Sequence, residues 1–295
     1  MRASLLWEVR STRIFDIRFL IKDPEGEIPV ETFETLEYEK SHDGKVATIW
    51  LNRPESLNAI NNTLAREREE ALKLADADEE VRAILIRGRG RAFCAGRDLK
   101  ELSGEALGNQ AESWRIVRSS GLLALSNDWH ISKPTIAIVH GFAVAGGFEM
   151  MMWCDLAIVT DDAQIGDYHL NRGLLGGAGP YWAVPRSIGL RKTKELFWSG
   201  KLLSGKQAEE WGLVNLSVPA EELEQAIDDF VAPLIDKSPL ALEWCKLAVG
   251  RGLEADRETI ALLEHFMVMS NHQTQDAKEG ATAFVQKRQP TWEGR

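Results

Sequence analysis

Long apolar runs are missing from this chain of 295 residues, and so is any closely spaced group of cysteines. No apolar stretch reaches the roughly 18–20 residues that a membrane-spanning helix needs, so the sequence predicts no membrane partner. The three cysteines, Cys94, Cys154 and Cys245, stand far apart without the spacing of a metal site, which predicts no bound metal. Because Cys94 and Cys154 lie in apolar runs, where free thiols are usually buried, the sequence favours a reducing, cytoplasmic compartment.

Basic residues are fewer than acidic ones. The chain has 35 Lys and Arg against 45 Asp and Glu, a formal net charge of −10 at pH 7. Because an acidic surface repels a phosphate backbone, this balance predicts that the protein has no nucleic-acid partner. It leaves room for a local basic pocket that takes one phosphorylated ligand. The hydrophobic content of 44% is enough for a sizeable buried core.

Short apolar runs alternate with segments of helical spacing. The runs predict buried strands at residues 46–52, 81–88, 134–141 and 156–161. Helical spacing covers residues 62–78, 109–127 and 148–155. The first of these helices places four apolar residues on one face: Leu64, Ala71, Leu72 and Ala75. Strands that alternate with helices of crossover length predict an α/β fold with a parallel sheet.

The last third of the chain changes to helices. Their spacing predicts helical segments at residues 203–212, 219–236, 239–252 and 257–273. In the first of them, Ser204 and Gln207 have the capping-box spacing, and Gly212 is a natural C-terminal stop. A helical tail is therefore expected to follow the α/β core.

A glycine pair and one carboxylate introduce the apolar helix at 148–155. Gly146 and Gly147 lack a Cβ, so backbone N–H groups at this helix start can face a ligand. Such a site suits an oxygen that gains negative charge during a reaction. Glu149 follows one turn later among apolar neighbours, which would raise the pKa of its carboxyl and suit it for acid–base work. A glutamate that only caps the helix start is the alternative.

The stretch RAFCAGRDLKEL offers a second helix start of the same kind. Gly96 precedes it, and the backbone N–H of Arg97 would stand at its beginning. Asp98 and Glu101 have the spacing of a capping box, which by itself accounts for Asp98. Donors from two separate turns, the N–H groups of Arg97 and Gly146, would together make an oxyanion hole.

Four stretches carry a family resemblance: LNRPESLNAI, GRAFCAGRDLKEL, KPTIAIVHGFAVAGGFEMMMWCDLAIVTDDAQIG and LSGKQAEEWGLVNLSVPAEEL. From about Phe33 to Trp292 the chain resembles the enoyl-CoA hydratase/isomerase (crotonase) superfamily. The resemblance implies an α/β core at residues 33–215, built as a spiral of strand–strand–helix turns and preceded by an extension at 1–32. A C-terminal helical region at 216–295 would assemble the chain into a homotrimer or a dimer of trimers.

The resemblance also implies an acyl-CoA thioester as substrate, with no cofactor beyond the CoA moiety itself. The thioester carbonyl would lie between the N–H groups of Arg97 and Gly146. The implied contacts to CoA and substrate are those of Arg97, Asp98, Leu99, Lys100, Phe284 and Lys287. The last two would reach CoA from a neighbouring subunit. For Lys287 the alternative is a solvated charge beside Arg288.

One position departs from the family pattern. Hydratases of the family use two glutamates, of which one activates water and the other delivers a proton to the α-carbon. Glu149 matches the first, and His169 stands where the second is expected. His169 could replace it, because imidazole has a suitable pKa, or Asp167 could serve from the same face of an extended loop. In a third interpretation neither serves, and Glu149 acts alone.

These implications favour an enoyl-CoA hydratase or isomerase, most simply a lyase, with Glu149 as the acid/base residue. Alternatives in the same superfamily are a CoA-thioester hydrolase, a decarboxylase and a carbon–carbon bond hydrolase. A different class of protein would be a catalytically inactive homologue that binds CoA or RNA. The negative net charge weighs against RNA, and the presence of Glu149 weighs against an inactive protein.

Overall fold

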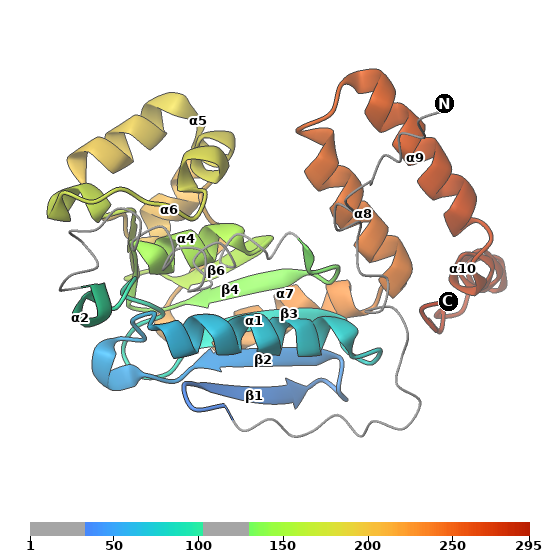
Figure 1. The fold of residues 1–295 in the computed structure, drawn as a ribbon. Helices are drawn as coiled ribbons and strands as arrows, with labels where there is room; N and C mark the ends of the chain where they lie inside the picture. The colour runs from blue at the N-terminus through green and yellow to red at the C-terminus, as the bar shows by residue number, and fades with distance from the viewer. Residues whose placement is uncertain (1–32, 103–129) are drawn as a thin grey trace, which may run out of the picture. The chain divides into compact units, whose positions relative to one another are not determined.

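Among the described residues, six strands form the main sheet (Figure 1). The computed structural model describes residues 33–102 and 130–295, so the extension at 1–32 and the helix expected at 109–127 lie outside the described residues. In sheet order the strands are β1 (Leu36–Ser41), β2 (Val46–Leu51), β3 (Ala83–Gly88), β4 (Thr135–Val139), β6 (Leu156–Thr160) and β8 (Leu216–Val218). Of these described strands, β1 runs antiparallel to its neighbour, and the other pairs are parallel. The predicted α/β class is confirmed.

Helices follow or separate these strands. The α-helices are α1 (Asn62–Ala77), α2 (Leu99–Leu102), α4 (Gly146–Trp153), α5 (Pro180–Ser199), α6 (Gly205–Trp211), α7 (Leu223–Ile235), α8 (Pro239–Gly252), α9 (Arg257–Asn271) and α10 (Gln275–Gln286). Short 3₁₀ turns are η2 (Pro54–Ser56), η5 (His169–Arg172) and η6 (Ala220–Glu222). Across the described ranges, none of the helices is both long and apolar enough to cross a membrane.

The central strands of the main sheet, β2, β3, β4 and β6, are mostly buried on both faces, which explains their continuous apolar sequences. On β3, Ile84 and Ile86 join the core cluster that includes Leu64 of α1. Leu85 points to the opposite face and packs in a second cluster with Ile227 of α7. Successive side chains of a strand point to opposite faces of the sheet, so one strand contributes to both core clusters. The four residues expected on one face of α1 are all buried.

A second, two-stranded sheet positions the residues of interest. It pairs β5 (Phe142–Val144) with β7 (Gln164–Gly166) in parallel, with Val144 opposite Gly166. Because the strands end in register, the residues that follow each of them emerge at the same edge. Ala145 and α4 follow β5, while Asp167 and η5 follow β7. A bridge between Cys94 and Ala143 brings the stretch before Arg97 to the same place.

Helix termini agree with the sequence where local capping decides them. Ser204 accepts a hydrogen bond from the N–H of Gln207, whose side chain accepts from the N–H of Ser204, so the predicted capping box is confirmed. Gly212 ends α6 in the left-handed conformation, also as predicted. Helix α8 has the predicted bounds. Helices α5 and α10 and strands β1, β5 and β8 are additions that the sequence pattern did not show.

Helices α8 and α9 pack on each other, and Figure 1 shows them with α10 at one end of the main sheet, away from α2 and α4. Many of their apolar side chains are exposed in the single chain: Leu247, Val249, Leu253, Leu262, Phe266, Val268, Met269, Phe284 and Val285. An apolar surface of this kind marks an interaction site in many proteins. The predicted trimer or dimer of trimers stays a prediction.

Candidate active site

The turn that contains Gly96 and the turn that contains Gly146 meet at the start of α4. A Cβ built on Gly96, whose φ is 92°, would lie 3.0 Å from the backbone nitrogen of Gly146. A Cβ built on Gly146 would lie 3.4 Å from the backbone nitrogen of Arg97. The close approach therefore requires glycine and brings the two N–H groups together. This geometry is what an oxyanion hole needs.

A local bridge decides which way the N–H of Arg97 faces. Ile60 donates to the carbonyl of Gly96 (2.8 Å), and the N–H of Asp98 donates to the carbonyl of Ile60 (2.9 Å). Successive peptide groups of an extended segment point to opposite sides, so Arg97 N–H points away from Ile60. In residues 33–102 and 130–295, no backbone oxygen accepts from Arg97 or Gly146 N–H.

The buried Glu149 carboxylate lies next to this turn. Its side-chain atom Oε1 accepts hydrogen bonds from the backbone N–H groups of Gly177 (2.8 Å) and Ala178 (3.1 Å). Only 2% of the residue is exposed. Burial raises the pKa of Glu149, and the two N–H donors and the nearby His169 offset part of that effect. The predicted direction of this pKa shift is confirmed.

Asp167 and His169 form a hydrogen-bonded pair on the segment after β7. Asp167 Oδ2 lies 3.1 Å from His169 Nδ1, and Asp167 Oδ1 accepts from the backbone N–H of His169 (3.2 Å). Burial by itself lowers the pKa of His169. The hydrogen bond and charge of Asp167, together with the charge of Glu149, outweigh burial and raise that pKa. The sequence offered His169 and Asp167 as alternative catalytic groups, and in the structure they form one hydrogen-bonded pair.

Gly176 shows how closely the two acids approach. A Cβ built there would lie 2.8 Å from Glu149 Oε1 and 3.2 Å from Asp167 Oδ2. The N–H of Gly176 donates to the hydroxyl of Tyr181 (3.1 Å), which places a third polar side chain at the same loop. Gly176 therefore lets the loop lie against both carboxylates, where a larger residue would displace them.

Comparison with known proteins shows the family of the chain. The sequence pattern of the enoyl-CoA hydratase/isomerase family matches residues 41–295. The chain belongs to the enoyl-CoA hydratase/isomerase family. It is 37% identical to a probable mitochondrial enoyl-CoA hydratase of Dictyostelium discoideum, over 84% of this chain and 88% of that protein.

Solved structures of the family share the fold of this member. The structure of an enoyl-CoA hydratase from Bacillus anthracis has a TM-score of 0.82 and 29% identity, covering 89% of this chain and all of that one (100%). An enoyl-CoA hydratase from Mycobacterium smegmatis has a TM-score of 0.80 and 31% identity, covering 88% of this chain and 98% of the other.

In this family member, α2 is capped differently from the sequence prediction. Asp98 Oδ1 accepts from the N–H of Lys100 (3.1 Å), but Glu101 accepts from the N–H of Asn62 (3.0 Å) instead of reaching back to Asp98. The expected capping box is wrong, because Asp98 N–H is already bonded to the carbonyl of Ile60. Asp98 Oδ2 also pairs with Arg53 at 3.0 Å.

The other residues assigned to CoA lie on two different parts of the chain. Leu99 and Lys100 are exposed on α2, next to the turn of Arg97. The Arg97 side chain is mostly buried and donates to Asn62. Phe284 is 85% exposed on α10, and Lys287 ends that helix. Because α10 is at the opposite end of the sheet in Figure 1, one chain does not bring Phe284 and Lys287 to Glu149.

Sequence reasoning missed Trp153, which contacts the loop around Glu149. Trp153, one turn after Glu149 on α4, donates from its indole nitrogen to the carbonyl of Ala178. The Trp153 ring stacks on Trp182, with centroids 6.3 Å apart and an interplanar angle of 9°. The available signal was the helical spacing of Glu149 and Trp153, which puts both on one face of α4.

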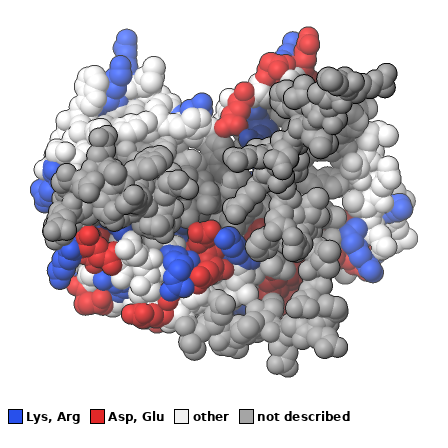
Figure 2. All heavy atoms as spheres, viewed as in Figure 1, with Lys and Arg blue, Asp and Glu red and all other residues white. Residues whose placement is uncertain are grey.

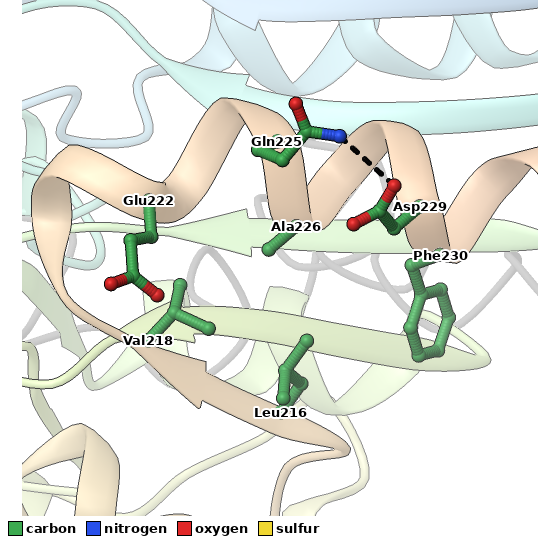
Figure 3. Close-up of a pocket in the computed structure, with 7 residues that line it drawn as sticks. All are labelled: Leu216, Val218, Glu222, Gln225, Ala226, Asp229 and Phe230. Carbon is green, nitrogen blue, oxygen red and sulfur yellow. Dashed lines mark hydrogen bonds between the residues drawn. The ribbon is translucent and has the colours of Figure 1, made fainter.

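A cavity of about 490 Å³ opens elsewhere, between β8 and α7 (Figure 3). It is lined by Leu216, Val218, Glu222, Gln225, Ala226, Asp229 and Phe230. None of these seven residues belongs to the predicted site, and the Gln225 amide already donates to Asp229 (2.9 Å). The polar groups of the groove therefore partly satisfy one another, and we assign no chemistry to it.

The surface charge of the described residues is mixed. On the face shown in Figure 2, Lys and Arg are interspersed with Asp and Glu instead of gathering in one broad basic area. Among residues 33–102 and 130–295, no group of three or more His, Cys, Asp or Glu side chains is placed to hold a metal ion.

Proposed function

We propose that this protein processes acyl-CoA thioesters and that its reaction is the hydration of a 2-enoyl-CoA, which makes it a lyase. The observation that carries the proposal is the convergence of Glu149 and His169 beside the paired N–H groups of Arg97 and Gly146. The enoyl-CoA hydratase names of its relatives support the same reaction.

Each group would have one task in this reaction. The N–H groups of Arg97 and Gly146 would stabilise the thioester oxygen as it becomes an enolate oxygen. Glu149 would take a proton from water as the hydroxyl adds to the β-carbon. His169, as imidazolium, would give its proton to the α-carbon. The product gains one water, and a proton passed from Glu149 to His169 would restore both groups.

The environments of the two residues suit these tasks. Burial raises the pKa of Glu149, so its carboxylate is a stronger base than an exposed one. Burial lowers the pKa of His169, but the carboxylates of Asp167 and Glu149 outweigh burial and raise it, which favours the protonated imidazole that the acid role needs. Both shifts therefore favour one base and one acid in the pair.

The CoA moiety would bind along Arg97, Asp98, Leu99 and Lys100. Phe284 and Lys287 would come from another copy of the chain, because α10 lies far from α4 within one copy. The assembly would be a homotrimer or a dimer of trimers, and the reaction would use no cofactor beyond the CoA of the substrate.

The experiment is the hydration of crotonyl-CoA by the wild type, Glu149→Gln and His169→Glu. We expect wild-type turnover and a drop of about 10²- to 10⁴-fold in Glu149→Gln, the usual range for a lost general base. An exposed-site control is Glu195→Gln, at the surface of α5. If the wild type shows no turnover but His169→Glu does, hydration is rejected as the natural reaction. The result would still show that the oxyanion hole works.

A second candidate function is double-bond migration in an enoyl-CoA. The Glu149 carboxylate, held by loop N–H groups with the imidazole of His169 as partner, favours it, because a proton can move between two carbons without added water. Exchange of substrate α-protons in D₂O without formation of a 3-hydroxyacyl product would identify this outcome.

A further inference from the structure

The carboxylate of Asp167 has both of its oxygens engaged by one residue, His169. Asp167 Oδ1 accepts from the backbone N–H of His169 at 3.2 Å, and Oδ2 lies 3.1 Å from the ring atom Nδ1. Only 1% of Asp167 is exposed, so water does not compete for these bonds. Asp167 is thus poorly placed to act on a substrate itself.

We propose that Asp167 is a positioning residue that holds the His169 ring with Nδ1–H as donor, so that Nε2 carries the proton used in the reaction. An ionised carboxylate only accepts hydrogen bonds, so the Nδ1 atom facing it must bear a hydrogen. The other ring nitrogen is then the one that exchanges a proton with the substrate. This inference rests on the proposed function, because it assigns a purpose to the histidine of that site.

The charged groups that face His169 support this arrangement. Asp167 from the segment after β7 and Glu149 from α4 both favour a positive imidazole, and burial opposes it. The hydroxyl of Tyr181 from α5 approaches the same loop as a neutral group. With Asp167 replaced by Asn, His169 would lose the nearer negative charge, and its titration would move to lower pH.

The backbone adds a second reason for the Asp–His pair. Tyr168, between the two residues, has φ of 58°, a left-handed conformation that is uncommon for a residue with a side chain. This turn brings the carboxylate of residue 167 back to the N–H and the ring of residue 169. The local fold therefore fixes ring orientation as well as charge, which is what a proton donor to a specific carbon requires.

The first test reads His169 directly and needs no turnover. The full-length protein is labelled with ¹³C,¹⁵N-histidine, and His169 is assigned from its absence in His169→Gln. We expect the ring nitrogens of the wild type to show Nδ1–H in the neutral form, and Asp167→Asn to titrate at lower pH. Asp162→Asn is the matched control, because Asp162 is exposed in the turn before β7.

An unchanged His169 titration and tautomer in Asp167→Asn would overturn the proposal. The same measurement stands even if the wild type hydrates no enoyl-CoA, in which case the proposed function fails but the role of Asp167 is still decided.

The second test is kinetic. Asp167→Asn is expected to lower kcat for crotonyl-CoA by at least about tenfold and to move the alkaline limb of the pH profile to lower pH, while KM stays nearly constant. In a His169→Glu background, the Asp167→Asn change should cost no further activity, because its partner is gone. An equal loss in both backgrounds would show a merely structural residue and reject the positioning role.

Discussion

Single residues of this site have their charges set by their neighbours. Glu149 is desolvated but keeps two N–H donors, and His169 is desolvated but keeps two acidic neighbours. Both pKa values are raised, the first because burial dominates and the second because the carboxylates outweigh burial. The surroundings of the two residues therefore favour a stronger base at Glu149 and the protonated form of His169.

Hydration should have a bell-shaped pH dependence. Activity rises as Glu149 loses its proton, at a pH above that of an ordinary carboxyl group, and falls as His169 loses its proton, above that of an ordinary imidazole. The measurement is kcat/KM for crotonyl-CoA against pH. In His169→Glu the alkaline limb should disappear; its persistence would assign that limb to another group.

The backbone of Ala145 is strained, and a substitution can remove this strain. It precedes α4 with φ of 50° and ψ of −120°, a conformation suited to glycine. Ala145→Gly should raise the free energy of unfolding by about 1 kcal/mol, because lost strain exceeds the added entropy of the unfolded chain. Urea denaturation measures this change.

The opposite sign is expected for a control in ordinary helix. Replacement of Ala261, which is exposed within α9, by glycine should lower the free energy of unfolding by about 1 kcal/mol. Destabilisation of similar size at Ala145 would show that its backbone is not strained.

At the scale of elements, two side chains of α4 form hydrogen bonds with the loop at residues 176–179. Glu149 accepts from its N–H groups, and Trp153 donates to the carbonyl of Ala178. A Cβ on Gly179 would lie 2.1 Å from the Trp153 ring, so the indole and the loop are in close contact. The position of the loop then decides how firmly the Glu149 carboxylate is held.

Trp153→Phe should loosen that loop. The N–H donors of Gly177 and Ala178 lower the pKa of Glu149, so weaker bonds should raise it and move the acidic limb of the pH profile to higher pH. We expect kcat to fall by roughly tenfold. Trp198→Phe, at a residue 71% exposed, is the control and should change neither. If the acidic limb does not move, Trp153 has no influence on the pKa of Glu149.

At the scale of the whole molecule, α8 and α9 expose apolar side chains that a partner would cover. Phe266 is 61% exposed on α9, and Leu253 is 64% exposed at the end of α8. We expect light scattering to give an assembly mass of three or six times that of one chain. Phe266→Glu should lower this mass. Trp198→Glu, outside these helices, should leave the mass unchanged. A wild-type monomer would contradict the predicted assembly.

Local signals in the sequence determined much of the fold. The apolar strands, the buried face of α1 and the bounds of α6 and α8 follow from periodicity and capping, which act over a few residues. Strands β1, β5 and β8 were missed because they are short or carry exposed polar residues. Their strand conformation depends on neighbours distant in the chain.

The sequence by itself singled out Glu149, the glycine turns of Arg97 and Gly146, and the two candidates Asp167 and His169. Only the tertiary structure decided that the last two form a pair, that Glu149 binds the N–H groups of residues 177 and 178, and that Glu101 bonds to Asn62. Hydrogen-bond partners and burial are set by segments far apart in sequence, which the register of β5 and β7 brings to one edge. Periodicity reports which side of an element is buried, but it does not report what lies against that side.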